Sequence, residues 1–233
     1  MNRVPRPAAA PAGSLSARMR VGSAAEHTEA EASPFMAGLL DGRLPATCYA
    51  DYLLALAAVY GALEGAGRAL VPEASRPDPL AAAVWDPVLE RGAALDDDLR
   101  LWVGEDWRSR AEPGPAVTAY ARELAASRED PLAFVAHHYT RYLGDLSGGQ
   151  AIGRIITRTY GLEDGAGTAF YRFPGVPKPK LYKDSYRARL DALGLSEPDQ
   201  HRVVEHVRAA FAHNQAVFAE LAAAADRRAP VNL

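Results

Sequence analysis

Glycine residues interrupt the longest helical pattern in this 233-residue chain. Apolar residues recur at helical spacing from Pro131 to about Tyr160. The middle of this pattern nevertheless holds three glycines: Gly144, Gly148 and Gly149. A glycine in a helix interior costs roughly 1 kcal/mol relative to alanine. The sequence therefore predicts a long helix that bends, or whose backbone lies directly against another group.

Two interpretations fit these glycines. Small residues let two helices cross closely, and they also let a backbone lie against a flat ligand. Asp145 lies between the glycines, and we expect it to face the same space. A bent helix with an exposed backbone and one buried acid describes a ligand site better than a packing contact. Spacing alone leaves both interpretations open.

Helical periodicity also dominates the rest of the chain. The sequence contains no strand pattern, glycine-rich phosphate loop, nucleophile elbow, metalloprotease motif or repeat of fixed period. We predict an all-α, single-domain bundle of about eight helices, the first of them a continuous helix over residues 16–32. The predicted domain covers residues 18–226, between a Pro- and Ala-rich tail of residues 1–17 and a short tail of residues 227–233.

Composition narrows the functional classes. The net charge of −3 argues against broad affinity for nucleic acid or membranes. The single cysteine, Cys48, excludes an internal disulfide and a thiolate metal cluster. No apolar run approaches the roughly 20 residues that span a bilayer. We expect a soluble, cytoplasmic protein with no membrane anchor and no nucleic-acid partner.

The run from Tyr139 to Gln150, YTRYLGDLSGGQ, resembles the signature of the haem oxygenase family almost letter for letter. The resemblance covers residues 18–222. It implies that haem lies between a proximal helix and a bent, Gly-rich distal helix. It also implies oxidative opening of haem, which is both substrate and cofactor, to biliverdin, carbon monoxide and ferrous iron. Such a reaction consumes O2 and needs electrons from a ferredoxin or a flavin reductase.

His27 is the candidate iron ligand. His27 and Glu31 are four residues apart and share a helix face. A lone helix histidine is more often a surface or core residue than a ligand. Haem ligation needs a neutral imidazole whose second nitrogen is held by an acceptor, a role that Glu31 suits. The resemblance implies that His27 binds the iron and that Glu31 is its partner.

Basic residues form a candidate clamp for the haem propionates. Lys183 and Arg187 are four residues apart, and such a cationic pair suits carboxylates. The resemblance implies that these two residues, together with Arg20 and Tyr139, hold the propionates. A second basic position of the family is occupied here by Ala24. We expect this clamp to favour cleavage at the α-meso carbon.

The resemblance also implies roles on the distal side. Asp145 would organise water beside bound oxygen and deliver protons. Arg141 and Tyr60 would fix that network, although Tyr60 alone could equally be a core tyrosine. The remaining implied pocket residues are Gly144, Gly148, Gly149, Phe211 and Asn214.

Two alternatives to catalysis of this kind remain. The first is a haem carrier or sensor with the same pocket and no turnover, which would not need the distal acid Asp145. The second is a thiaminase-like relative that uses similar helical architecture for another reaction. That alternative predicts a catalytic cysteine or carboxylates in the pocket, and Cys48 has no visible base partner in the sequence.

Overall fold

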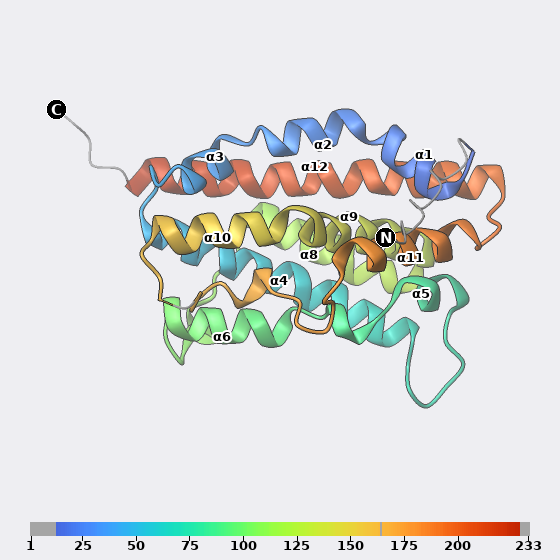
Figure 1. Ribbon diagram of the computed structural model, residues 1–233, viewed down its shortest axis with the longest axis horizontal. Coiled ribbons are helices and arrows are strands. Elements are labelled where there is room, and N and C mark those ends of the chain that lie inside the picture. The colour runs from blue at the N-terminus through green and yellow to red at the C-terminus, as the bar shows by residue number, and fades with distance from the viewer. Residues whose placement is uncertain (1–12, 164, 229–233) are drawn as a thin grey trace, which may run out of the picture.

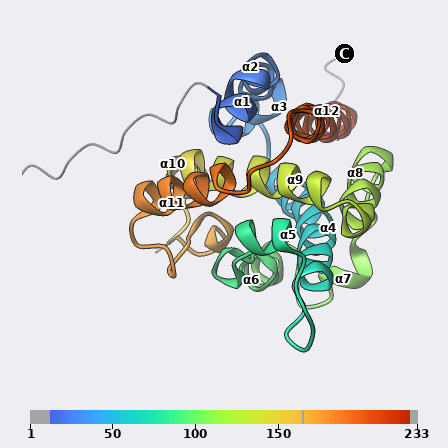
Figure 2. The same cartoon turned by 90° about the vertical axis from the view of Figure 1, so that its right-hand side faces the viewer.

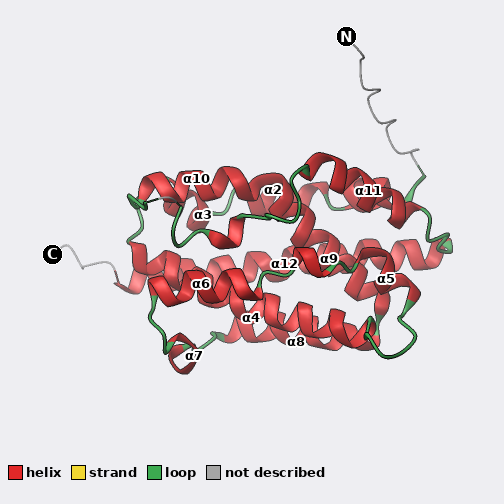
Figure 3. Ribbon diagram, turned by 60° about the horizontal axis from the view of Figure 1, so that its bottom comes forward, coloured by secondary structure: helices red, strands yellow, loops and turns green. Residues whose placement is uncertain are grey.

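The computed structural model describes residues 13–163 and 165–228, without the side chain of Glu31. No strand occurs in these ranges, so the all-α prediction is confirmed for them (Figure 3). The chain divides into more helices than the eight or so expected, because several expected helices are split or are preceded by short ones. The first six helices are α1 (Leu15–Gly22), α2 (Ala24–Glu31), α3 (Pro34–Leu40), α4 (Ala46–Leu70), α5 (Pro79–Val84) and α6 (Gly92–Trp102).

The remaining helices include the longest one, α12, and the interrupted one, which comprises α9 and α10. They are α7 (Trp107–Arg110), α8 (Pro115–Ala126), α9 (Pro131–Gly144), α10 (Gln150–Thr159), α11 (Pro179–Asp191) and α12 (Glu197–Arg228). Between α9 and α10 the helix continues through a π-helical turn, labelled η3 (Asp145–Gly149).

Two long helices organise the packing. α12 runs along the molecule beside α8 and α9, and α1, α2 and α3 lie along it (Figure 1). α4 packs against α6, α8 and α9 on the opposite side of α9 from α2, as the end-on view shows (Figure 2). The core of α4 is strongly apolar, with fully buried Leu53, Leu63 and Tyr60. The interrupted helix α9–η3–α10 is therefore the middle layer of the bundle.

The continuous first helix predicted over residues 16–32 is wrong. The structure divides this segment at Ser23, whose backbone (φ −121°, ψ 18°) leaves the helical region. The Ser23 hydroxyl donates to the carbonyl of Met19 (2.7 Å), so the side chain competes with the helical ladder. α1 begins at Leu15, inside the segment expected as a tail, and residues 1–12 of that tail lie outside the described residues.

α4 is the one described helix that is long and apolar enough to cross a membrane. Its most apolar window has a mean hydropathy of 1.3, and 56% of that window is buried inside the fold. Core helices of soluble proteins have this property, so its length and composition are weak evidence for a membrane span.

Two adjacent histidines are buried in α9. His137 and His138 are fully buried, and His138 Nδ1 lies 2.9 Å from the Tyr186 hydroxyl. Burial lowers the pKa of each imidazole to about 3. Both histidines are therefore neutral in the folded protein at neutral pH.

These histidines predict loss of stability in acid. Unfolded histidines bind protons below about pH 6.5 whereas the folded ones do not until about pH 3, so stability falls as pH decreases through this window. Between pH 7 and pH 5, the free energy of unfolding should decrease in both proteins. We expect the decrease in His138→Gln to be about 2 kcal/mol smaller than the decrease in the wild type. Urea unfolding at the two pH values measures this difference. His201→Gln, at a solvent-exposed histidine, should keep the wild-type loss, and equal losses in His138→Gln and wild type would contradict the assignment.

Candidate functional site

The expected bend of the distal helix is a π-helical turn. α9 passes through Asp145–Gly149 into α10 without leaving helical backbone angles, and Gly149 has φ −55° and ψ −43°. A π-turn widens the helix locally and is found frequently at functional sites. The glycines therefore do not break the helix, and their role has to be read from what surrounds each one.

The three glycines of the motif divide into two groups. A Cβ atom built on Gly144 meets nothing within 4 Å, and one on Gly148 meets only Ile152, at 4.0 Å. A Cβ on Gly149 would instead lie 3.4 Å from the Tyr171 ring. A close crossing of two helices therefore does not explain why glycine occupies positions 144 and 148. The backbone at both positions faces an open region. The structure favours the ligand interpretation at these two positions.

A hydrogen-bonded network surrounds Asp145. The Tyr60 hydroxyl donates to Asp145 Oδ2. Arg141 Nε donates to the Tyr60 hydroxyl (3.2 Å), and Arg141 Nη1 donates to Asn214 Oδ1 (2.7 Å). These four residues come from α4, α9, η3 and α12, so the fold brings together side chains that are up to 154 positions apart (214 − 60).

Burial and charge act in opposite directions within this network. Burial raises the pKa of the Asp145 carboxyl, while the Arg141 guanidinium and the Tyr60 hydroxyl lower it, and the net direction is upward. Burial alone would lower the pKa of Arg141, but Tyr60 and Asp145 raise it well above its usual value. Arg141 is therefore a fixed cation, and Asp145 is a carboxyl whose proton affinity is increased. Such a carboxyl can exchange protons with a neighbouring water or substrate.

The candidate proximal histidine lies on α2. His27 is exposed, and its ring meets Phe211 of α12 edge-on, with 5.7 Å between ring centroids. α2 packs against α12, which fixes this pair relative to each other. The side chain of Glu31, the expected partner of His27, lies outside the described residues.

The residues of the expected propionate clamp lie near α9 and the π-turn. Lys183 Nζ donates to Ser147 Oγ in the π-turn (2.8 Å), which ties α11 to η3. Burial and then Arg187 lower the pKa of Lys183. Burial raises the pKa of Tyr139, and the charges of Arg187 and Arg20 oppose that rise, so both cations lie near its ring. Cations this close to one another suit an anionic ligand such as a pair of carboxylates.

These features fit a flat, dianionic macrocycle with its own iron. The region in front of Gly144 and Gly148 is open, cations gather at its edge, and an aromatic ring lies beside His27. The described residues hold no group of three or more His, Cys, Asp or Glu side chains that could bind a metal without a macrocycle.

Comparison with known proteins decides the family. The sequence model of one family, described as Heme oxygenase, matches residues 13–220. This chain belongs to the haem oxygenase family. It is 36% identical over 210 residues to heme oxygenase 1 of Nostoc sp., covering 89% of this chain and 85% of that protein. It is 34% identical over 210 residues to human heme oxygenase 1, covering 89% of this chain and 71% of that protein.

Solved structures of haem oxygenases have the same fold. Heme oxygenase-1 of Synechocystis sp. in complex with heme superposes with a TM-score of 0.84 at 31% identity, covering 92% of this chain and 95% of that one. Heme oxygenase-2 of Synechocystis sp. in complex with heme and NO gives a TM-score of 0.85 at 33% identity, covering 93% and 88%. The haem oxygenase fold expected from the sequence resemblance is therefore confirmed.

Several polar groups near the site carry no signature in the sequence. Glu64 is buried in α4, where its Oε1 accepts from the Tyr142 hydroxyl (3.1 Å) and from the backbone N–H of Arg91 (2.5 Å). Tyr52 and Tyr171 also lie near Asp145. The one signal that could have indicated Glu64 is its position as one of only two acids, with Asp51, in the apolar pattern of residues 46–70. The tyrosines look like ordinary core residues until the fold places them.

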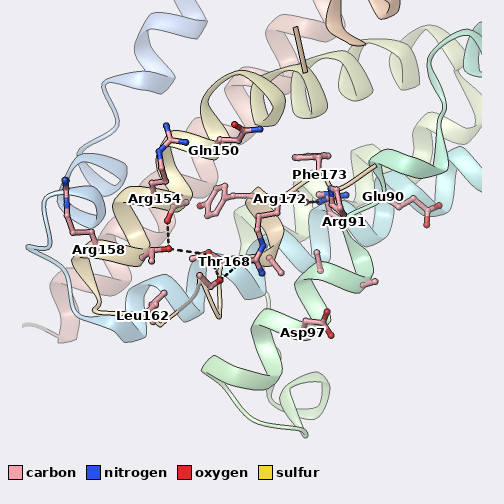
Figure 4. A pocket seen from close by; sticks show the side chains of 18 of the residues that line it. Glu90, Arg91, Asp97, Gln150, Arg154, Arg158, Leu162, Thr168, Arg172 and Phe173 are labelled. Carbon is pink, nitrogen blue, oxygen red and sulfur yellow. Dashed lines mark hydrogen bonds between the residues drawn. The ribbon is translucent and has the colours of Figure 1, made fainter. Parts of the chain in front are cut away.

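A large cleft lies beside α10, outside the expected haem site. It has a volume of about 1350 Å³ and is lined by α6, α10 and the segment 161–174, with Arg154 and Arg158 along α10 (Figure 4). None of the expected haem-binding residues lines this cleft. Its wall does include Gly153 and Tyr171, which pack against each other next to the π-turn.

Filling the open region at Gly144 should block haem without harming the fold. We expect Gly144→Leu to be at least as thermally stable as wild type, because nothing lies within 4 Å and a helical glycine is lost. Haem affinity should fall by roughly tenfold or more, since the leucine occupies the ligand's space. Thermal unfolding and a Soret titration measure the two quantities. The matched control is Gly61→Leu on α4, where a Cβ also meets nothing. Unchanged haem affinity in Gly144→Leu would place the ligand elsewhere.

Proposed function

We propose that this protein is a haem oxygenase that opens haem at a meso carbon to give biliverdin, carbon monoxide and ferrous iron. The reaction consumes O2 and electrons from a separate donor, a ferredoxin or a flavin reductase. One observation carries the proposal beyond family membership. The carboxyl of Asp145 accepts from the Tyr60 hydroxyl, which in turn accepts from Arg141, next to two glycines whose backbone faces open space.

In this proposal His27 ligates the haem iron, and Glu31 holds the second imidazole nitrogen. Bound in this way, haem supplies the iron that activates O2 and the macrocycle that is cleaved. Phe211 lies beside the proximal imidazole, at 5.7 Å between ring centroids. On the distal side, Gly144 and Gly148 present backbone where a larger side chain would collide with a flat ligand. Gly149, also expected to bind haem, instead faces the Tyr171 ring.

Asp145 is the proposed proton-transfer group. Tyr60 donates to its Oδ2, and no described residue donates to its Oδ1, which is available to water. Arg141 orients Tyr60 through a 3.2 Å hydrogen bond, and Asn214 orients Arg141. Because burial raises the pKa of Asp145, the carboxyl can hold a proton and pass it through water to the reacting face.

The proposed clamp sets which meso carbon is attacked. Arg20, Tyr139, Lys183 and Arg187 would bind the two propionates and so fix the in-plane rotation of haem. Ala24 is exposed near Arg20 on the α2 side and adds no charge to the clamp. We propose α-meso cleavage, with Lys183 held by Ser147 and Arg187 by Asp184.

A haem carrier or sensor is the weaker alternative. Membership of an enzyme family and the half-buried acid at the distal face both favour turnover over storage. The proposed site of action is the cytoplasm, with haem, O2 and a ferredoxin or flavin reductase as partners.

Asp145→Ala should separate binding from turnover. We expect the variant to bind haem with near-wild-type affinity, because its proposed anchors are on other residues. Biliverdin formation should fall by about 10²- to 10⁴-fold, the usual contribution of a positioned proton-transfer group. The assay follows the Soret band, carbon monoxide and biliverdin after ascorbate or a reductase is added in air. Asp97→Ala, at an exposed acid on α6, should behave as wild type. Wild-type turnover by Asp145→Ala would remove this residue from the mechanism.

Loosening the clamp should change the product isomer. Arg187→Ser removes one of the proposed propionate ligands, so we expect haem to rotate in the pocket and biliverdin to form as a mixture of isomers. Chromatography of the product measures the isomer ratio. Arg154→Ser, at an exposed arginine on α10, removes the same charge outside the clamp and should leave one isomer. A single unchanged isomer from Arg187→Ser would show that other residues set the rotation.

A further inference from the structure

A buried hydrogen bond fixes helix α11 against α9. The Tyr186 hydroxyl of α11 lies 2.9 Å from His138 Nδ1 of α9, and the two rings stack with 5.8 Å between their centroids. Both side chains are fully buried. Breaking a hydrogen bond in such a place is costly, because neither group could replace its partner with water. The position of α11 along the distal helix is therefore well determined.

Lys183 lies one turn before Tyr186 on α11, and its ammonium reaches the π-turn. Lys183 Nζ donates to Ser147 Oγ at 2.8 Å, a contact between residues that are 36 positions apart in the chain. Ser147 directly precedes Gly148, whose backbone, like that of Gly144, faces the open region. The Lys183 ammonium is therefore placed at the border of that region.

The Ser147 hydroxyl has a fixed direction. It donates its one proton to the carbonyl of Leu143, one turn earlier, at 2.6 Å. Only its lone pairs are left for other partners, and one of them accepts from Lys183. Consecutive hydrogen bonds of this kind strengthen one another. Ser147 is thus a directed acceptor on the π-turn, although the residue itself is exposed.

A neutral partner orients the ammonium without cancelling its charge. Within the described parts of the chain Lys183 forms no ion pair, whereas Arg187 Nη1 lies 3.3 Å from Asp184 Oδ1. The same carboxylate is shared with Lys180, at 3.5 Å. Burial and Arg187 lower the pKa of Lys183, and the charge of Asp184 opposes this effect without reversing it. A half-buried ammonium in these surroundings favours an anionic ligand.

We propose that Ser147 is a positioning residue for Lys183: its hydroxyl fixes the ammonium at the border of the open region and thereby sets the in-plane orientation of a bound, dianionic macrocycle. Without the hydroxyl, the flexible four-carbon stem of Lys183 can adopt other rotamers, so the ammonium no longer marks one position. The flat ligand would then bind in more than one rotation. The identity of the macrocycle rests on the proposed function, whereas the contact between Ser147 and Lys183 does not.

A double-mutant cycle tests the contact in the haem-free protein. Ser147→Ala and Lys183→Met each remove one partner, and methionine keeps an apolar stem. The double variant should melt roughly 2 °C higher than the sum of the two single shifts predicts, because one hydrogen bond cannot be lost twice. Ser185→Ala combined with Lys183→Met should give additive shifts, since Ser185 accepts from Arg189 instead. Additive shifts for the Ser147 and Lys183 variants would overturn the proposal.

The orientation of haem can be read without turnover. In the cyanide complex of the ferric protein, the haem methyl groups give a separate set of shifted ¹H NMR resonances for each in-plane orientation. The probe is a haem that is symmetric about the axis through its α- and γ-meso carbons, so that turning the macrocycle over adds no second set. We expect one set from wild type and at least two from Ser147→Ala. A single wild-type set from Ser147→Ala would contradict the positioning role.

Two variants are controls for the resonance pattern. Ser147→Thr keeps the hydroxyl at an exposed position, so it should give the wild-type set. Ser185→Ala removes a serine hydroxyl that accepts from Arg189 Nη1 at 3.2 Å, on the same helix as Lys183, and should also give the wild-type set. Extra sets from either control would show that the orientation does not depend on the Ser147 hydroxyl, and would overturn the proposal.

Turnover separates failure of this inference from failure of the proposed function. With natural haem and a reductant in air, wild type should give one biliverdin isomer and Ser147→Ala a mixture. If Ser147→Ala changes the haem orientation but neither protein makes biliverdin, the positioning role stands and the proposed function fails. If wild type makes biliverdin and Ser147→Ala keeps one orientation and one isomer, the function stands and the positioning role fails.

Discussion

The buried guanidinium of Arg141 is the interaction on which the arrangement of the site depends. A full charge in the protein interior is tolerated only when its donors are matched, and removing a partner from such a charge is strongly destabilising. Arg141 meets this requirement with Tyr60 of α4 and Asn214 of α12, so one side chain of α9 fixes three helices relative to one another. Asp145 is one turn further along the same helix, and its hydrogen bond from Tyr60 completes the set. The hydrogen bonds that Arg141 makes therefore also determine where Asp145 lies.

The π-turn has one face packed against the protein interior and another face that leaves its backbone open. Gly149 and Gly153 face the interior, where the Tyr171 ring lies too close for larger side chains. Gly144 and Gly148 face an open region, where nothing in the described structure requires a glycine. One face of the helix is therefore packed as tightly as any core contact while the other leaves backbone accessible. A flat ligand next to a fixed acid needs both properties at once.

Particular residues show how far the sequence could predict this structure. Helical periodicity indicated the all-α class, the motif from Tyr139 to Gln150 indicated the family, and the wider resemblance implied the association of Asp145 with Arg141 and Tyr60. It could not indicate the division of the first helix at Ser23, because that depends on a serine hydroxyl competing locally for the Met19 carbonyl.

Tertiary placement explains the polar residues that the sequence did not reveal. Glu64, Tyr52 and Tyr171 follow the apolar periodicity of their segments, and each becomes a polar neighbour of the site only when α4, α9 and the 3₁₀ turn pack together. Their hydroxyl and carboxyl groups have no local partner in the sequence that would distinguish them from core residues. The roles of His27, Glu31 and the basic clamp stay predictions, since they are defined by a ligand and not by contacts within the chain.

The most direct test of the central claim is a single turnover of the haem-loaded protein with a reductant in air. The account predicts that the Soret band disappears while carbon monoxide and biliverdin appear together, in amounts equal to the haem consumed. A Soret band that persists under these conditions, with no carbon monoxide released, would contradict it and identify the protein as a haem carrier or sensor.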